Sequence, residues 1–175
     1  MKNIRGLLIL IFLFHSSVLV GQEISQKYPE LIERVSHINK DTSLIKVTLE
    51  NEEFMTQMTD GGGELVGYFK NGQIQKIATR IGLSYGLKVT DYYFTNGELI
   101  FTFEILEEFL YNESLSKFDY SNTDTSFIGL YYFKGNKLID SESTGHNRFE
   151  KDELDYETTI LNSVKEYGDK LKKRQ

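Results

Sequence analysis

The chain has 175 residues, a formal net charge of −6 at pH 7 and no cysteine. The absence of cysteine excludes disulfides, thiolate metal sites, a thiol nucleophile and the lipid-modified N-terminal cysteine of a bacterial lipoprotein. The acidic balance disfavours nucleic acids and anionic membranes as partners, because both are bound through clustered lysine and arginine. A chain of this length suffices for one domain with a core of its own.

The first 21 residues are typical of a secretory signal peptide. Two basic residues, Lys2 and Arg5, precede an apolar run, and polar sequence begins after Gly21. An uncleaved membrane anchor is the alternative, although the run is near the short end of the about 17–25 residues that span a bilayer. We therefore expect residues 22–175 to form a single secreted or periplasmic domain with no membrane span after cleavage. Secretion without disulfides favours a bacterial protein.

The mature chain is expected to begin with a helix over residues 28–39. Pro29 is favourable at a first helical position, and four apolar residues follow at helical spacing: Leu31, Ile32, Val35 and Ile38. The next segment, "SLIKVTLEN", alternates between apolar and polar residues and predicts a half-buried strand. "EEFMTQM", residues 52–58, is a candidate second strand, and "TDGGGE" after it predicts a turn or flexible loop.

Three similar phrases follow, "GYFKNGQIQKI", "DYYFTNGELIFTF" and "LYYFKGNKLID". Each contains a dipeptide that favours a two-residue hairpin turn, because both of its residues tolerate positive φ: Asn71-Gly72, Asn96-Gly97 and Gly135-Asn136. Counting outward from each turn predicts a phenylalanine–aliphatic pair on one face of the sheet: Phe69 with Ile74, Phe94 with Leu99, and Phe133 with Leu138.

One step further out, the same count pairs tyrosines on the opposite face: Tyr68 with Gln75, Tyr93 with Ile100, and Tyr132 with Ile139. In the middle hairpin it also pairs Tyr92 with Phe101 on the Phe94 and Leu99 face. Because an isolated hairpin is marginally stable, the hairpins are expected to join one antiparallel sheet over residues 43–142.

The polar stretch 111–126 has no sustained period and predicts a long loop or an excursion at a sheet end. The last segment, residues 148–173, predicts a helix with one apolar stripe: Phe149, Tyr156, Ile160, Val164, Tyr167 and Leu171. The expected fold is therefore α+β: a twisted antiparallel β-meander of about six to eight strands, with an N-terminal and a C-terminal helix packed on it.

The hairpin phrases resemble a group of small secreted bacterial proteins with no assigned function. The shared pattern is a Gly-Gly turn, a YF-x-x-G-x-[IL] hairpin, a YYF-x-x-G-x-L-x-F-x-F hairpin and a final YYF-x-x-x-x-LI hairpin. The resemblance covers residues 60–140, and this chain departs from it after the last "LI", where "DSES" stands in place of an aromatic residue. It implies secretion and a meander sheet, but no activity and no catalytic residues.

Two patterns suggest a hydrolase as an alternative function. "GLSYG" matches the G-x-S-x-G nucleophile elbow at Ser84, with Asp119 or Asp124 and then His146 following in the order of that triad. The elbow requires a helix after the serine, whereas β-rich sequence follows here. Glu104 and Glu108 share a face if their segment is a strand, and two carboxylates on one face could flank a glycosidic bond.

We expect no catalytic residue, no metal site and no cofactor, and the leading hypothesis is a non-enzymatic ligand- or partner-binding module. Its candidate binding residues are Tyr68, Tyr93 and Tyr132, which share a face and pair apolar area with a polar tip. The partner would be a peptide, a glycan or an envelope protein. The competing interpretation is that a helix covers this row, and a purely structural envelope component is a further alternative function.

Overall fold

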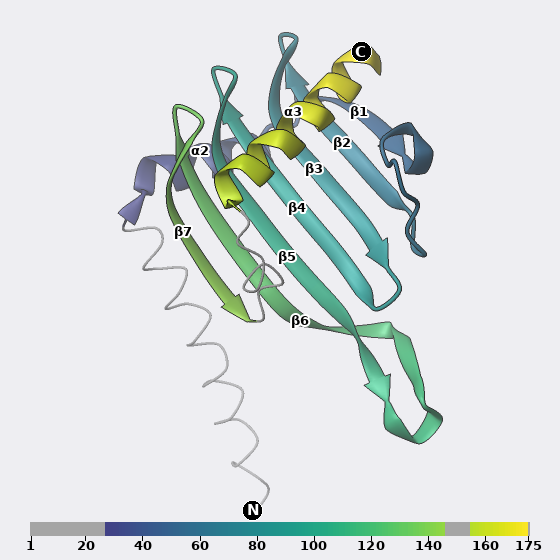
Figure 1. Cartoon of the computed structure of the whole chain (residues 1–175). Coiled ribbons are helices and arrows are strands. Elements are labelled where there is room, and N and C mark those ends of the chain that lie inside the picture. Colours follow the sequence, from purple (N-terminus) through teal and green to yellow (C-terminus); the bar gives the residue numbers. More distant parts are fainter. Residues whose placement is uncertain (1–26, 146–154, 175) are drawn as a thin grey trace, which may run out of the picture. The chain divides into compact units, whose positions relative to one another are not determined.

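The computed structural model describes residues 27–145 and 155–174 (Figure 1). The expected signal peptide lies outside these residues. The chain divides into two units, Met1–Lys40 and Asp41–Gln175, and each is described by itself. Across the described residues, no helix combines the length and the apolar character needed to cross a membrane.

The described part of the first unit is helix α2, Pro29–Lys40. It begins and ends within one residue of the predicted bounds. Glu30 in the first turn and Lys40 in the last turn complement the helix dipole. The expected packing of this helix on the sheet stays a prediction.

The described residues of the second unit form one antiparallel sheet of seven strands in sequence order, followed by a C-terminal helix. The predicted α+β meander is confirmed (Figure 1). Its elements are β1 (Ile45–Glu50), β2 (Gly63–Lys70), β3 (Gln73–Leu83), β4 (Gly86–Thr95), β5 (Glu98–Asn112), β6 (Lys117–Lys134), β7 (Lys137–Gly145) and α3 (Tyr156–Arg174).

The three predicted hairpin turns are confirmed. Both central residues of each turn have positive φ, for example 52° at Asn71 and 74° at Gly72, as a type I′ turn requires. The phenylalanine–aliphatic pairs next to the turns are also confirmed: Phe69 with Ile74, Phe94 with Leu99, and Phe133 with Leu138.

The predicted pairs beyond that step are wrong, because each hairpin contains a one-residue β-bulge. Gln75, Ile100 and Ile139 are the extra residues. The observed partners are Lys76 for Tyr68, Phe101 for Tyr93, Asp140 for Tyr132, and Thr102 for Tyr92. A bulge places two residues opposite one and re-aims the side chains that follow it.

The bulge in the β4–β5 hairpin exchanges the faces of β5. Phe101 joins Tyr93 on one face, with the two ring centroids 5.9 Å apart. Glu104, two residues after Thr102 on the same side of the strand, faces α3 together with Tyr92. Because the bulge shifts every later position of β5 by one, Thr102 and Glu104 share the face of Phe94 and Leu99, and a charged residue lies in the layer beneath the helix.

Helix α3 lies obliquely across one face of the sheet (Figure 1) and closes the main core. The buried cluster contains Leu49, Phe54, Leu65, Phe69, Ile77, Tyr92, Phe94, Leu99, Tyr131, Phe133 and Leu171. Hydrogen bonds tie α3 down near both ends. The Leu138 N–H donates to Glu157 Oε2 at 2.6 Å, and Lys170 Nζ donates to the Phe54 carbonyl oxygen at 2.5 Å.

The helix begins at Tyr156 rather than at the predicted Arg148, because Asp155 is not helical and caps it. Asp155 accepts hydrogen bonds from the Glu157 N–H at 3.0 Å and from Thr158 Oγ1 at 2.6 Å. The Thr158 hydrogen bond also lowers the pKa of Asp155. Phe149, which the predicted stripe included, lies outside the described residues.

The predicted second strand over residues 52–58 is wrong. A short 3-10 helix, η1 (Asn51–Glu53), follows β1 directly. Asn51 has a φ of 50°, so the chain leaves the extended conformation at that residue. The Glu53 carboxylate accepts a hydrogen bond from the Glu50 N–H at 3.0 Å, which closes a capping box.

Of the two interpretations of residues 111–126, the long loop is wrong and the excursion at a sheet end is confirmed. Strands β5 and β6 continue past the sheet as a two-stranded ribbon, which projects from the rest of the unit (Figure 1). The ribbon turns through η2 (Glu113–Leu115), where the Asn112 side chain caps the Leu115 N–H at 3.1 Å. We call residues 109–125 the arm. The sequence is polar, but paired aromatic residues within it hold the two strands together.

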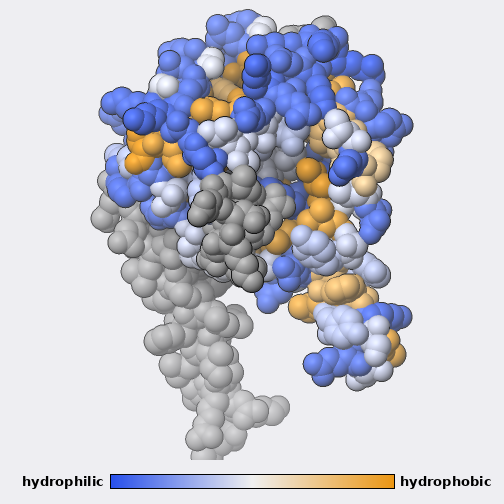
Figure 2. Space-filling model, in the orientation of Figure 1, coloured by the Kyte–Doolittle hydropathy of each residue, from blue (hydrophilic) through white to orange (hydrophobic). Residues whose placement is uncertain are grey.

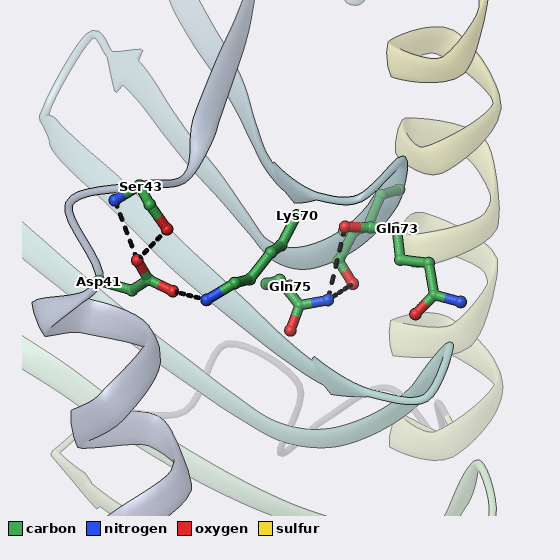
Figure 3. Close-up of polar contacts among 6 residues, drawn as sticks. Asp41, Ser43, Lys70, Gln73 and Gln75 are labelled. Atoms are coloured by element: carbon green, nitrogen blue, oxygen red, sulfur yellow. Dashed lines mark hydrogen bonds and ion pairs between the residues drawn. The ribbon is translucent and has the colours of Figure 1, made fainter.

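An ion pair connects the entry to β1 with the end of β2. Lys70 Nζ lies 2.6 Å from Asp41 Oδ2, and Ser43 donates to Asp41 Oδ1 through its N–H at 2.9 Å and its hydroxyl at 2.5 Å (Figure 3). The Lys70 hydrogen bond is the largest cause that holds the pKa of Asp41 well below its usual range, and Ser43 adds to it. Figure 3 also shows the bulged Gln75, whose Nε2 approaches the Gln73 carbonyl oxygen at 3.4 Å.

Replacement of Asp41 with asparagine is expected to make the free energy of unfolding less dependent on pH in the acid range. A carboxyl group with a lowered folded pKa stabilises the fold above its unfolded pKa of about 3.9, and this contribution is lost as the pH falls towards the folded pKa. Urea midpoints at pH 7 and about pH 2 should differ less for Asp41→Asn than for the unchanged protein. Lys70→Met should reduce the same difference between the two midpoints. If neither variant reduces it, the ion pair does not have the proposed role in stability.

Candidate functional site

Glycines from two sequence motifs meet at one end of the sheet. The Gly61 N–H donates to the Gly82 carbonyl oxygen at 3.2 Å, and the Gly82 N–H donates to the Gly62 carbonyl oxygen at 2.9 Å. A Cβ on Gly82 would lie 2.6 Å from the Gly61 Cα. The "TDGGGE" segment is therefore an ordered turn that closes against the end of β3, and only glycine permits the approach.

Ser84 lies in the tight turn between β3 and β4, so the predicted nucleophile elbow is not formed. An elbow needs a strand, a sharp turn and a helix, whereas here an antiparallel strand follows. The second glycine of the motif also has a packing reason, because a Cβ on Gly86 would fall on the Glu107 carbonyl oxygen. Asp119 is engaged by Ser121 and Asn122, and His146 lies outside the described residues.

Glu104 and Glu108, the candidate carboxylate pair, lie four positions apart on β5, where strand spacing puts their Cα atoms about 13 Å apart. Glu104 Oε2 is 2.7 Å from Lys88 Nζ, and Glu108 is exposed. The two carboxylates therefore belong to different surroundings.

A groove of about 810 Å³ lies where the glycine turns meet the arm, and we call it the arm groove. Its lining residues are Glu50, Asn51, Asp60, Gly61, Gly63, Glu64, Arg80, Gly82, Leu83, Ser84, Gly86, Leu87, Glu107, Phe109, Tyr120 and Thr123. Its volume falls within the range of small-molecule sites, about 300–1,000 Å³.

One wall of the arm groove is aromatic. The Phe109 and Tyr120 rings are in edge-to-face contact with centroids 5.0 Å apart, and the row continues through Phe118 to Tyr111. Tyr120 is 68% exposed and Tyr111 is 55% exposed. Apolar residues lie among hydrophilic ones on the projecting arm (Figure 2). Of its four rings, those of Tyr111 and Tyr120 are exposed and those of Phe109 and Phe118 are half-buried.

The opposite wall is polar. Glu64 and Arg80 are register partners on β2 and β3, and Glu50 is the β1 partner of Glu64. They lie on the face away from α3, because the neighbouring Leu65 belongs to the core under the helix. The groove therefore sets a guanidinium and carboxylates, which donate and accept hydrogen bonds, opposite two aromatic rings.

The predicted tyrosine row forms, but most of it is not accessible. Tyr93 and Tyr132 are 4% and 0% exposed, and Phe101 lies between them with ring centroids 5.9 and 5.3 Å away. Tyr68 is half-buried, with Lys46 Nζ 5.3 Å from its ring centroid. Of the two interpretations of this row, an exposed patch is therefore wrong for Tyr93 and Tyr132, and binding at Tyr68 stays a prediction.

Between Tyr68 and Tyr93 stands an ion pair that no sequence pattern predicted. Lys76 Nζ is 2.6 Å from Asp91 Oδ2 and lies 5.7 and 4.9 Å from the two ring centroids. Tyr93 also donates to Asp91 Oδ2 at 3.1 Å. Burial works against the charge on Lys76, but the Asp91 carboxylate outweighs burial and raises the pKa of Lys76.

A second cavity, of about 240 Å³, lies between α3 and the sheet, and we call it the helix cavity. It is lined by Thr79, Ile81, Leu83, Lys88, Thr90, Tyr92, Glu104, Tyr131, Tyr156, Thr159, Ile160, Ser163 and Tyr167. Inside it, Lys88 Nζ and Glu104 Oε2 are 2.7 Å apart. Burial raises the pKa of Tyr92 and Tyr167, and the Glu104 carboxylate adds to both shifts.

Sequence reasoning missed Arg80, Phe109 and Tyr120. A signal for the two aromatics was present: Phe109 and Tyr111, and then Phe118 and Tyr120, alternate at strand spacing on both sides of a polar turn. Among residues 27–145 and 155–174, no three histidine or acidic side chains are grouped to hold a metal ion. No protein-family model, curated protein or solved structure matches this chain.

Proposed function

We propose that this chain is a secreted or periplasmic binding protein without catalytic activity, and that it holds a carbohydrate chain in the arm groove. The observation that carries the proposal is the aromatic pair of exposed Tyr120 and half-buried Phe109, whose side chains both line an open polar groove. The signal-like N-terminal sequence supports the location.

A carbohydrate fits this arrangement because sugars combine apolar C–H faces with many hydroxyl groups. The rings of Phe109 and Tyr120 offer apolar area at a small cost in conformational entropy. On the other wall, the Arg80 guanidinium can donate hydrogen bonds to sugar hydroxyls and the Glu64 carboxylate can accept them. A peptide is the runner-up, since it would use the same rings but would also call for main-chain hydrogen bonds from a strand edge.

Binding without hydrolysis is supported by the positions of the two catalytic candidates. Ser84 lies in a hairpin turn, and Glu104 is paired with Lys88. A structural envelope component would need no groove of this size. The three functions predict different outcomes with a soluble oligosaccharide. A hydrolase would cleave it and a structural component would not respond to it, whereas the proposed binding protein would bind it and leave it uncleaved.

The test uses cellotetraose, maltotetraose and chitotetraose as probes. We expect at least one of them to shift the backbone amide NMR signals of Gly61, Gly63 and Gly82. Replacement of Tyr120 with alanine should weaken that binding about 2- to 13-fold, because an aromatic contact contributes about 0.5–1.5 kcal/mol. Chromatography should recover the sugar uncleaved.

Tyr111→Ala is the matched control, since Tyr111 is an exposed tyrosine of the same arm that does not line the groove. It should bind the sugar as the unchanged protein does. If none of the three sugars moves the glycine signals at about 10 mM, roughly ten times a weak millimolar dissociation constant, the carbohydrate proposal is wrong. A response to trialanine alone would replace it with a peptide ligand.

A further inference from the structure

The helix cavity is separate from the arm groove. It lies under α3, on the face of the sheet that carries Tyr92, and Leu83 is the one lining residue that the two share among those described. Most of this face is filled by apolar and aromatic side chains. A cavity with charged walls in that layer is unlike the core beside it and requires an explanation of its own.

The charged walls are Lys88 and Glu104, whose side chains are only 16% and 13% exposed. The free energy lost when the two charges leave water is about as large as the free energy gained from their mutual attraction. A variant with apolar residues of the same size at both positions would therefore be at least as stable. The pair on the other face, Lys76 and Asp91, is equally buried but is packed against tyrosine rings. Lys88 and Glu104 instead border free volume.

The charges of the cavity restrict the charge of a ligand. The charges of Lys88 and Glu104 sum to zero, and a ligand with a net charge would leave one charge uncompensated beside a largely buried ion pair. A zwitterion keeps the balance, because its carboxylate can approach Lys88 while its ammonium approaches Glu104. Thr90 Oγ1, 3.4 Å from Glu104 Oε2, adds a hydroxyl to the same wall.

The size and the remaining walls restrict the ligand further. A volume of about 240 Å³ holds about eight water molecules at about 30 Å³ each, which corresponds to a molecule of amino-acid size. The tyrosine ring of Tyr167 and the side chains of Ile81 and Ile160 supply apolar surface. We propose that the helix cavity is a binding site for a free amino-acid zwitterion with a small apolar side chain.

The first test compares L-valine with two analogues of the same shape that each lack one charge, 3-methylbutanoate and 2-methylpropylamine. We expect L-valine to shift the amide NMR signals of Thr90 and Ser163 at about 10 mM, since ligands with about eight heavy atoms bind at about millimolar strength. Each analogue should bind about 10-fold more weakly or worse, because it loses a charged hydrogen bond. No response to L-valine, or equal binding of an analogue, would overturn the proposal.

The second test separates a binding role from a structural role. Lys88→Met combined with Glu104→Met should abolish the L-valine response, while its urea midpoint equals or exceeds that of the unchanged protein. Glu104→Gln alone provides a milder variant and should weaken L-valine about 10-fold. If the double variant still binds L-valine, the proposal is wrong. It is also wrong if the urea midpoint of the double variant falls and the unchanged protein does not respond to L-valine.

Matched controls lie elsewhere in the second unit. Lys76→Met with Asp91→Asn removes the comparable ion pair on the other face and should leave the L-valine response intact. Tyr120→Ala should also leave it intact, because Tyr120 lines only the arm groove. The proposal of a carbohydrate site and the proposal of an amino-acid site are therefore tested independently. If one of them is contradicted, the other is unaffected.

Discussion

Replacement of Gly82 with alanine is expected to lower the free energy of unfolding by about 3 kcal/mol, the upper end of the usual cost of overpacking. The added Cβ would lie 2.6 Å from the Gly61 Cα and 2.7 Å from its carbonyl oxygen. Both neighbours are backbone atoms, and two hydrogen bonds fix the strands at this point. The clash therefore cannot be relieved by a side-chain rotation, and a domain with about 5–15 kcal/mol of stability would lose a large fraction of it.

Urea unfolding measures this effect, and two neighbouring variants serve as controls. Ser84→Ala changes an exposed turn residue and should stay within about 0.5 kcal/mol of the unchanged protein. Gly72→Ala has nothing within 4 Å of its added Cβ but a φ of +74°, so it should cost about 1–2 kcal/mol through backbone strain alone. A Gly82→Ala loss below about 1 kcal/mol would show that the Gly61 turn moves aside.

Replacement of Leu171 with alanine is expected to cost about 3–4 kcal/mol, within the range of about 2–5 kcal/mol for buried leucine. Leu171 is 0% exposed and belongs to the core cluster. It fits over Gly67, where a Cβ would lie 2.9 Å from the Leu171 Cδ1. The missing side chain of Gly67 therefore leaves space that the Leu171 side chain fills. Leu171→Ala would leave a cavity there.

A double-mutant cycle with Gly67→Ala checks this contact. Gly67→Ala alone should destabilise the fold, but it should cost less when Leu171 is already alanine, because one of its two clashes is gone. Additive effects of the two substitutions would contradict direct packing of Leu171 on Gly67. Lys172→Ala, at the exposed neighbouring position, should change stability by no more than about 0.5 kcal/mol.

The hairpins were predictable because their signals are local. Asn71-Gly72 specifies a turn from two adjacent residues, and the Phe69–Ile74 pair follows by counting one step. The bulges were missed because the count assumed unbroken alternation. A signal exists in β3, where the core residues Ile74 and Ile77 are three positions apart, a spacing that regular alternation forbids.

The candidate site was less predictable. The alternation of side chains along a strand predicts which face of the sheet a residue lies on, but it does not predict which other elements cover that face. Tyr93 was correctly assigned a shared face with Tyr132, yet both rings are buried. The arm groove depends on Arg80 and Tyr120, which are 40 positions apart in the sequence. Only the path of the ribbon beyond the sheet brings them to one groove, and no short sequence pattern encodes that path.

The attachment of α3 has a consequence for the order of folding. The sheet face that contains Phe69, Ile77 and Tyr92 is closed by Leu171, which is synthesised after every strand. A chain that is still growing, or that is shortened before α3, would present this aromatic face to its surroundings. Such a face favours aggregation or capture by a chaperone. The closing helix therefore makes completion of the core a late event, which follows the synthesis of all the strands described.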